Sequence, residues 1–118
     1  MLVVDDNVDA ATMLAMVLEL DGHAVRTVHT GTEAINTYDD GIAPDIIFLD
    51  IGLPDISGYE VAAQLRQRRA FDRTVIVALT GWGSDRDKQR STDVGFDLHL
   101  TKPVAPEKLR EVMETLQR

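Results

Sequence analysis

Five polar residues stand where short apolar runs of the sequence stop: Asp5 and Asp6, Asp50, Thr80, and Lys102. A carboxylate can bind a cation or attack phosphorus, while an ammonium and a hydroxyl can neutralise and hydrogen-bond phosphoryl oxygens. One acidic residue at the end of an apolar run is most often a solvated cap. Four run ends that each carry a suitable group predict a phosphoryl-transfer site, provided that the runs are neighbouring strands.

Three carboxylates in one crevice cannot all stay ionised unaided. At about 4 Å and an effective dielectric constant near 20, each like-charged pair costs roughly 4 kcal/mol. Either one of Asp5, Asp6 and Asp50 is protonated, or a cation lies among them, since Lys102 offsets only one charge. Oxygen ligands in an open site favour Mg²⁺, and Ca²⁺ is less favoured because the chain has no EF-hand loop. Zn²⁺ is disfavoured because cysteine is absent and the histidines are scattered.

The elements that must position these residues alternate along the chain. Short β-branched runs predict buried strands at residues 2–4, 24–28, 45–49, 74–79 and 97–100. Helices are expected at 8–21, at 31–39, from Ser57, over 84–95 and from Pro106. The alternation predicts an α/β fold, a three-layer (βα)5 sandwich in which ligands bind beyond the carboxyl ends of parallel strands. The second strand ends at His29, where we expect no matching chemistry.

Length and composition exclude several classes of protein. The chain has 118 residues and a mass of 13.1 kDa, which predicts a single domain over residues 1–118. There is no apolar run long enough for a membrane span, no secretion signal and no cysteine, so we expect a cytoplasmic protein without direct membrane contact. The net charge of −8 argues against nucleic-acid binding. We interpret the basic cluster Arg66, Arg68 and Arg69 as a solvated helix face.

Four motifs occur in an order and at separations that together are highly specific: Val3-Val4-Asp5-Asp6-Asn7, then Asp50 with Leu53-Pro54-Asp55 and Gly58, then Thr80-Gly81, then Lys102-Pro103. In these motifs the chain resembles, over essentially its whole length, a response-regulator receiver domain of two-component signalling. The resemblance implies a flavodoxin-like fold with strand order 2-1-3-4-5, an order known for a chemotaxis receiver. It also implies a cis peptide between Lys102 and Pro103.

The resemblance implies a role for each matching residue. Asp50 would be the phosphoacceptor, which takes its phosphoryl group from a phosphohistidine, and Lys102 would contact that group. Asp6, Asp50 and the backbone carbonyl of Gly52 would hold Mg²⁺, with Asp5 acting through water. Thr80 would be the switch hydroxyl. His99 matches the family's second switch position, and a half-buried surface histidine is an equally good interpretation.

Partners follow from the same resemblance. A histidine kinase or a histidine phosphotransfer protein would dock beside residues 7–11. The signal would leave through the last two helices and the last strand, with a homodimer through that surface as a further expectation.

The isolated domain would not be an enzyme, because it would catalyse only its own phosphorylation and dephosphorylation. Residues 95–104 look most like receivers attached to hybrid histidine kinases. Gly52 and Trp82 depart from the family pattern and suggest slow dephosphorylation.

Three other classes remain as alternatives. A pseudo-receiver would bind proteins without being phosphorylated, which fits poorly with a complete set of polar residues. An aspartyl-nucleophile phosphatase of the haloacid-dehalogenase type needs a second aspartate two residues after the nucleophile, and Gly52 stands there. A flavin-binding domain needs phosphate-binding donors in its first loop, where Asp5 and Asp6 would repel phosphate.

Overall fold

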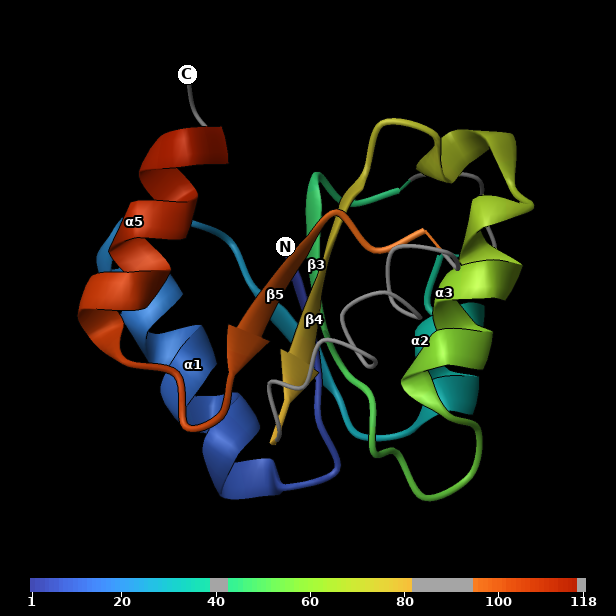
Figure 1. Ribbon diagram of the computed structural model, residues 1–118, viewed down its shortest axis with the longest axis horizontal. Coiled ribbons are helices and arrows are strands. Elements are labelled where there is room, and N and C mark those ends of the chain that lie inside the picture. Colours follow the sequence, from blue (N-terminus) through green and yellow to red (C-terminus); the bar gives the residue numbers. More distant parts are fainter. Residues whose placement is uncertain (39–42, 82–94, 117–118) are drawn as a thin grey trace.

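The sheet has the predicted strand order. A computed structural model of the chain describes residues 1–38, 43–81 and 95–116, and five parallel strands run through them in the order β2-β1-β3-β4-β5 (Figure 1). The strands are β1 (Leu2–Val4), β2 (Arg26–Val28), β3 (Ile46–Asp50), β4 (Val75–Thr80) and β5 (Leu98–Thr101). The chain therefore has the flavodoxin-like α/β fold that was expected.

Helices cover both faces of this sheet. They are α1 (Val8–Leu20), α2 (Gly31–Asn36), α3 (Gly58–Arg66), the 3-10 turn η1 (Arg69–Phe71) and α5 (Pro106–Leu116). Figure 1 shows α1 and α5 on one side of the sheet and α2 and α3 on the other, which makes three layers. The helix expected over 84–95 falls almost wholly outside the described residues. No described helix is both long enough and apolar enough to cross a membrane.

Each face of the sheet builds its own hydrophobic core. In β3, Ile46 and Phe48 pack with α1 and α5, whereas Ile47 and Leu49 pack with α2 and α3. All five residues of β3 are buried, because successive side chains point to opposite, equally covered faces. The continuous apolar runs of the sequence reflect this double burial. In a strand that is buried in this way, polar side chains can gather only at the ends.

Polar caps set where the helices begin. The side chains of Asn7, Thr30 and Ser57 each accept a hydrogen bond from the backbone N–H three residues later. The caps at Thr30 and Ser57 were predicted from their spacing to Glu33 and Glu60. Gly22, with φ of 91°, follows the C-cap of α1 in the left-handed conformation that glycine tolerates. These caps fix the loops that carry the candidate site.

The interpretation of the basic cluster was wrong for two of its three members. The side chain of Arg68 donates a hydrogen bond of 2.9 Å to the carbonyl of Ile35, at the end of α2. The side chain of Arg66 is also engaged and is only 21% exposed. Arg69 alone is exposed, as expected of a solvated position. The physical reason is that carbonyls left over at the ends of helices need donors, and long arginine side chains reach them.

Arg66 joins three segments near the amino ends of β4 and β5. Its guanidinium donates to the carbonyls of Gly95, Phe71 and Thr74 at 3.0, 2.7 and 2.8 Å. It also forms an ion pair of 2.7 Å with Asp97, whose carboxylate accepts the backbone N–H of Ile76. Arg66 thus ties the end of α3 to the start of β4 and to the segment that leads into β5.

Candidate functional site

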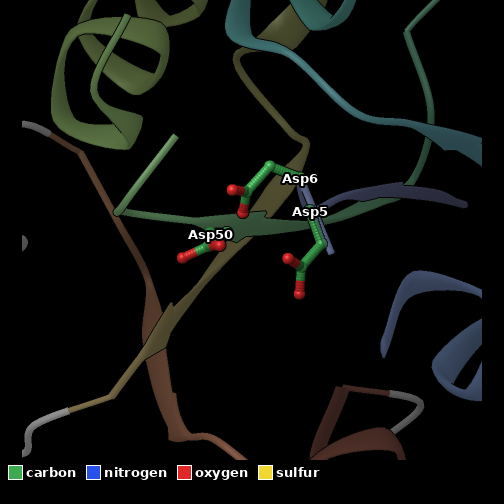
Figure 2. Close-up of side chains that lie close together, drawn as sticks. All are labelled: Asp5, Asp6 and Asp50. Carbon is green, nitrogen blue, oxygen red and sulfur yellow. The ribbon is translucent and has the colours of Figure 1, made fainter. Parts of the chain in front are cut away.

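The three carboxylates meet at the carboxyl ends of two central strands. Asp5 and Asp6 follow β1, and Asp50 is the last residue of β3. β1 and β3 are neighbours with Val4 paired to Leu49, so the residues that follow lie side by side (Figure 2). One oxygen from each carboxylate lies within 4.8 Å of the others. The sequence prediction that these residues converge is therefore confirmed by the geometry.

Two of these carboxylates are buried and hydrogen-bonded, and the third is exposed to solvent. Asp5 is 2% exposed and Asp50 is 6% exposed, whereas Asp6 is exposed. Oδ1 of Asp5 accepts the backbone N–H of Asn7, and Oδ1 of Asp50 accepts that of Gly52, each at 3.0 Å. A buried, oriented Asp50 beside an open Asp6 leaves one side of the site accessible to a ligand.

Lys102 supplies the positive charge of the site. Its Nζ lies 3.1 Å from Oδ2 of Asp50 and 3.2 Å from Oδ2 of Asp5. Burial lowers the pKa of Lys102, but the hydrogen bonds and charges of Asp50 and Asp5 outweigh burial and raise the pKa above its ordinary value. The side chain is therefore an ammonium at neutral pH. The peptide between Lys102 and Pro103 is cis, as the resemblance implied.

The donor set fits a hard divalent cation. Three carboxylates and one ammonium leave two negative charges if all are ionised, which matches one Mg²⁺. Every candidate ligand atom is oxygen, and the exposure of Asp6 leaves room for the waters that Mg²⁺ retains. Gly52, whose carbonyl is a further candidate ligand, lies beside Asp50. The residues present thus suit the ion that the resemblance implies.

Both candidate switch residues line one cavity on the β4–β5 side of the site. Thr80, at the end of β4, is 7% exposed, and its carbonyl accepts the backbone N–H of Lys102 at 2.7 Å. His99 is half-buried, with its ring centroid 6.5 Å from that of Phe96. Thr80 and His99 share a cavity of about 630 Å³. Trp82, whose departure from the family pattern suggested slow dephosphorylation, lies outside the described residues.

Two contacts of the site escaped the sequence analysis. His29 was expected to bring no matching chemistry, yet its Nδ1 lies 3.0 Å from the backbone carbonyl of Asp5. Asp55, quoted only as part of a motif, accepts hydrogen bonds from the N–H groups of Gly31 and Thr32 and from the hydroxyl of Thr32. The hydroxyl of Thr32, followed by its backbone N–H and that of Gly31, holds the pKa of Asp55 well below its ordinary value.

The fold and the acidic site define a class of protein, and comparison with known families identifies it. The chain matches the family described as Response regulator receiver domain over residues 1–114. It therefore belongs to the response-regulator receiver family of two-component signalling.

Curated relatives include regulators and a kinase. The chain is 38% identical to the transcriptional regulatory protein TcrA of Mycobacterium tuberculosis, over 99% of this chain and 45% of that protein. It is 35% identical to the alkaline phosphatase synthesis transcriptional regulatory protein PhoP of Bacillus subtilis, over 99% of this chain and 48% of that protein. A probable histidine kinase 2 of Oryza sativa is 31% identical over 95% of this chain and 12% of that protein. The chain thus spans less than half the length of these relatives.

Solved structures match along nearly the whole chain. The chemotaxis protein CheY4 of Vibrio cholerae has a TM-score of 0.91 and 30% identity, covering 98% of this chain and 95% of that one. The BeF3-activated receiver domain of DrrB has a TM-score of 0.85 and 31% identity, covering 99% and 96%. The receiver domain of a histidine kinase from Syntrophus aciditrophicus has a TM-score of 0.84 and 29% identity, covering 98% and 86%.

Proposed function

We propose that this chain is a working phosphoacceptor receiver that takes a phosphoryl group from a phosphohistidine onto Asp50. The observation that carries the proposal is the position of Asp50, which is buried at the end of a central strand, 3.1 Å from the ammonium of Lys102. A carboxylate oxygen of Asp50 attacks phosphorus. The P–N bond breaks, its electron pair stays on the imidazole nitrogen, and an acyl phosphate forms.

Each neighbouring residue has a share in this reaction. Lys102 neutralises the phosphoryl oxygens, and the hydroxyl of Thr80 reaches toward the new group as the switch. A bound Mg²⁺ would be held by Asp6, Asp50 and the carbonyl of Gly52, with Asp5 acting through water, and would neutralise further phosphoryl charge. His99 changes its packing as the second switch residue.

The site argues against the rival functions. A pseudo-receiver has no need of the oriented carboxylates and the ammonium that Asp5, Asp50 and Lys102 retain. A phosphatase of the aspartyl-nucleophile type needs a general acid two residues after Asp50, where Gly52 offers no side chain. We therefore expect the reaction to stop at one phosphoryl group per chain, without turnover as an enzyme.

The exposed side of α1 is the proposed docking surface for a histidine kinase or a histidine phosphotransfer protein. Val8, Met13, Met16 and Leu20 are 55%, 68%, 58% and 85% exposed, which is unusual for large apolar side chains. A cavity of about 430 Å³ between α1 and α5 extends from Met13 to Lys102. A partner bound there would bring its phosphohistidine to the open side of the site.

The signal leaves through a second surface in this proposal. Thr80 and His99 line a cavity beside β5 and the start of α5. Phosphorylation adds charge beside Thr80 and so biases the packing of β5 and α5. A homodimer through this surface, a cytoplasmic location and a single receiver unit over residues 1–118 belong to the same proposal. The relatives place such domains both in regulators and in a histidine kinase.

Phosphorylation by a small donor tests the proposal. The protein is incubated with acetyl phosphate, with and without Mg²⁺, and its intact mass is recorded. We expect a Mg²⁺-dependent gain of one phosphoryl group that Asp50→Asn abolishes. Asp45→Asn is the matched control, because Asp45 is exposed and precedes the opposite end of the same strand. A gain in Asp50→Asn equal to that of the parent protein would disprove the assignment of the phosphoacceptor.

A further inference from the structure

We propose that His29 is a positioning residue for the cation site, because its imidazole fixes the peptide group that joins Asp5 to Asp6. This inference rests on the proposed function, since it concerns the same Mg²⁺ site. Among the described residues, His29 forms no hydrogen bond with a side-chain oxygen of Asp5, Asp6 or Asp50. Its contact is with the backbone carbonyl of Asp5.

The contact begins where the β1–β2 ladder ends. The last paired residues are Val4 and Val28, and one further backbone bond of 3.2 Å runs from the N–H of Asp5 to the carbonyl of Val28. Beyond it, the side chain of His29 takes over, with Nδ1 3.0 Å from the carbonyl oxygen of Asp5. A carbonyl carries no hydrogen, so Nδ1 must be the donor. The imidazole of His29 therefore continues the hydrogen bonding between β2 and β1 by one residue.

That carbonyl belongs to the planar peptide group whose nitrogen is the backbone nitrogen of Asp6. Fixing the plane therefore fixes where Cα of Asp6 lies and where its side chain starts. Within the described parts of the chain, the carboxylate of Asp6 takes part in no hydrogen bond or ion pair. The other two carboxylates are each held by a backbone N–H and by Lys102.

His29 is itself held in place from both sides. Before it, Val28 is buried in the core under α2 and α3. After it, Thr30 caps α2 by accepting the backbone N–H of Glu33 at 3.1 Å. The backbone of His29 is pinned between a strand end and a helix cap, so its half-buried ring can hold a fixed position. A rigid second layer of this kind orients the ligands of a metal and raises its affinity.

The expected effect is on Mg²⁺ affinity and not on folding. Losing one orienting hydrogen bond behind a ligand should raise the dissociation constant of Mg²⁺ about tenfold. The residue type matters in a specific way. An asparagine can place its amide N–H where Nδ1 lies, whereas the longer glutamine reaches the position of Nε2, and leucine has no donor. Only His29→Asn should therefore keep tight binding.

Calorimetric titration with Mg²⁺ alone tests the inference on the whole chain. The variants are His29→Asn, His29→Gln and His29→Leu, with His23→Leu as a control at a histidine remote from the acidic cluster. Thermal unfolding in EDTA accompanies each titration. We expect His29→Asn and His23→Leu to bind within about threefold of the parent, and His29→Gln and His29→Leu to bind about tenfold more weakly, with similar unfolding temperatures in EDTA.

The outcomes separate this inference from the proposed function. If all three His29 variants bind Mg²⁺ like the parent, or if His29→Asn is weakened as much as His29→Leu, the positioning role is overturned and the phosphoacceptor proposal stands. If the parent binds no Mg²⁺, or if Asp6→Asn leaves its affinity unchanged, the cation site itself is overturned, and the role of His29 falls with it. A variant that does not fold in EDTA shows that His29 serves the fold, which also overturns the inference.

Discussion

The ammonium of Lys102 lies 3.1 Å from the carboxylate of Asp50, on the side away from the N–H of Gly52 that holds the other carboxylate oxygen. Asp50 is therefore oriented by two donors of different kinds. The backbone donor comes from its own loop and the charged donor from beyond β5. Only the ammonium of Lys102 carries a positive charge, so it can neutralise the negative charge that develops on the phosphoryl group.

Lys102→Gln should slow phosphorylation while leaving the protein folded. We expect the rate of phosphorylation by acetyl phosphate to fall at least about tenfold, since a charge-assisted contact contributes about 1.5–3 kcal/mol. Lys108→Gln is the matched control, because Lys108 is exposed and forms a loose pair of 3.7 Å with Glu111. Intact-mass kinetics measures both variants, and equal rates in Lys102→Gln and the parent would contradict the role of Lys102.

Mg²⁺ should stabilise the parent more than Asp50→Asn. Without the ion, Asp50→Asn removes one of three close negative charges, so its melting temperature should lie above that of the parent. At Mg²⁺ one hundred times its dissociation constant, the parent should gain about 2.7 kcal/mol, or roughly 10 °C. The variant should gain much less. Calorimetric melting in EDTA and in Mg²⁺ gives both quantities, and equal gains would argue against Asp50 as a ligand.

The strands and the acidic site could be predicted from the sequence because both depend on one simple constraint. Residues buried on both faces must be apolar, so polar residues such as Asp50 and Thr80 mark where strands end. Parallel strands bring those ends together. The prediction of Mg²⁺ chemistry needed only the types of residue at the ends.

The contacts of Arg66, Asp55 and His29 could not be predicted in the same way. Each joins segments whose packing is settled only by the tertiary fold, such as Asp55 with the start of α2. A polar side chain looks the same in the sequence whether it is solvated or hydrogen-bonded to a group that is distant along the chain. Element boundaries shifted for a related reason, since β2 begins at Arg26 and the expected strand began at Ala24.

Arg66→Met should destabilise the fold far more than Arg69→Met. The first change removes the guanidinium donor from the carbonyls of Phe71 and Thr74 and from the carboxylate of Asp97, and among the described residues only the Phe71 carbonyl and the carboxylate keep a backbone N–H donor. An unsatisfied, partly buried acceptor costs about 1–3 kcal/mol, so we expect a total loss of about 2–4 kcal/mol. Arg69 is exposed, and its replacement should cost about 0.5 kcal/mol or less. Urea unfolding measures the difference in stability, and similar midpoints for the two variants would contradict the stabilising role of Arg66.

Asp55 should make stability fall in acid. The hydroxyl of Thr32, then the N–H groups of Thr32 and Gly31, hold the pKa of Asp55 below its ordinary 3.8. A carboxyl whose pKa is lower in the folded state stabilises the fold above its unfolded pKa, and this contribution is lost as pH falls toward the folded pKa. Asp55→Asn should therefore flatten the loss of stability between about pH 4 and pH 2. Urea unfolding across this pH range measures how stability depends on pH, with Asp45→Asn as the control. Parallel curves for Asp55→Asn and the parent would contradict the contribution of Asp55.

Gly58→Ala should damage both the fold and the phosphoacceptor. A Cβ at Gly58 would lie 2.4 Å from the carbonyl oxygen of Asp50 and 2.7 Å from Cα of Ile51, and backbone atoms yield only at high cost. The N–H of Gly58 also donates to the carbonyl of Ile51 at 2.9 Å, so α3 cannot simply move away. We expect a loss of about 3 kcal/mol and slower phosphorylation of Asp50. Gly81→Ala is the matched control for stability, because a Cβ there meets nothing within 4 Å among the residues that the structure describes. Urea unfolding measures the stability of both variants. A Gly58→Ala protein as stable as Gly81→Ala would contradict the predicted clash with the backbone at the end of β3.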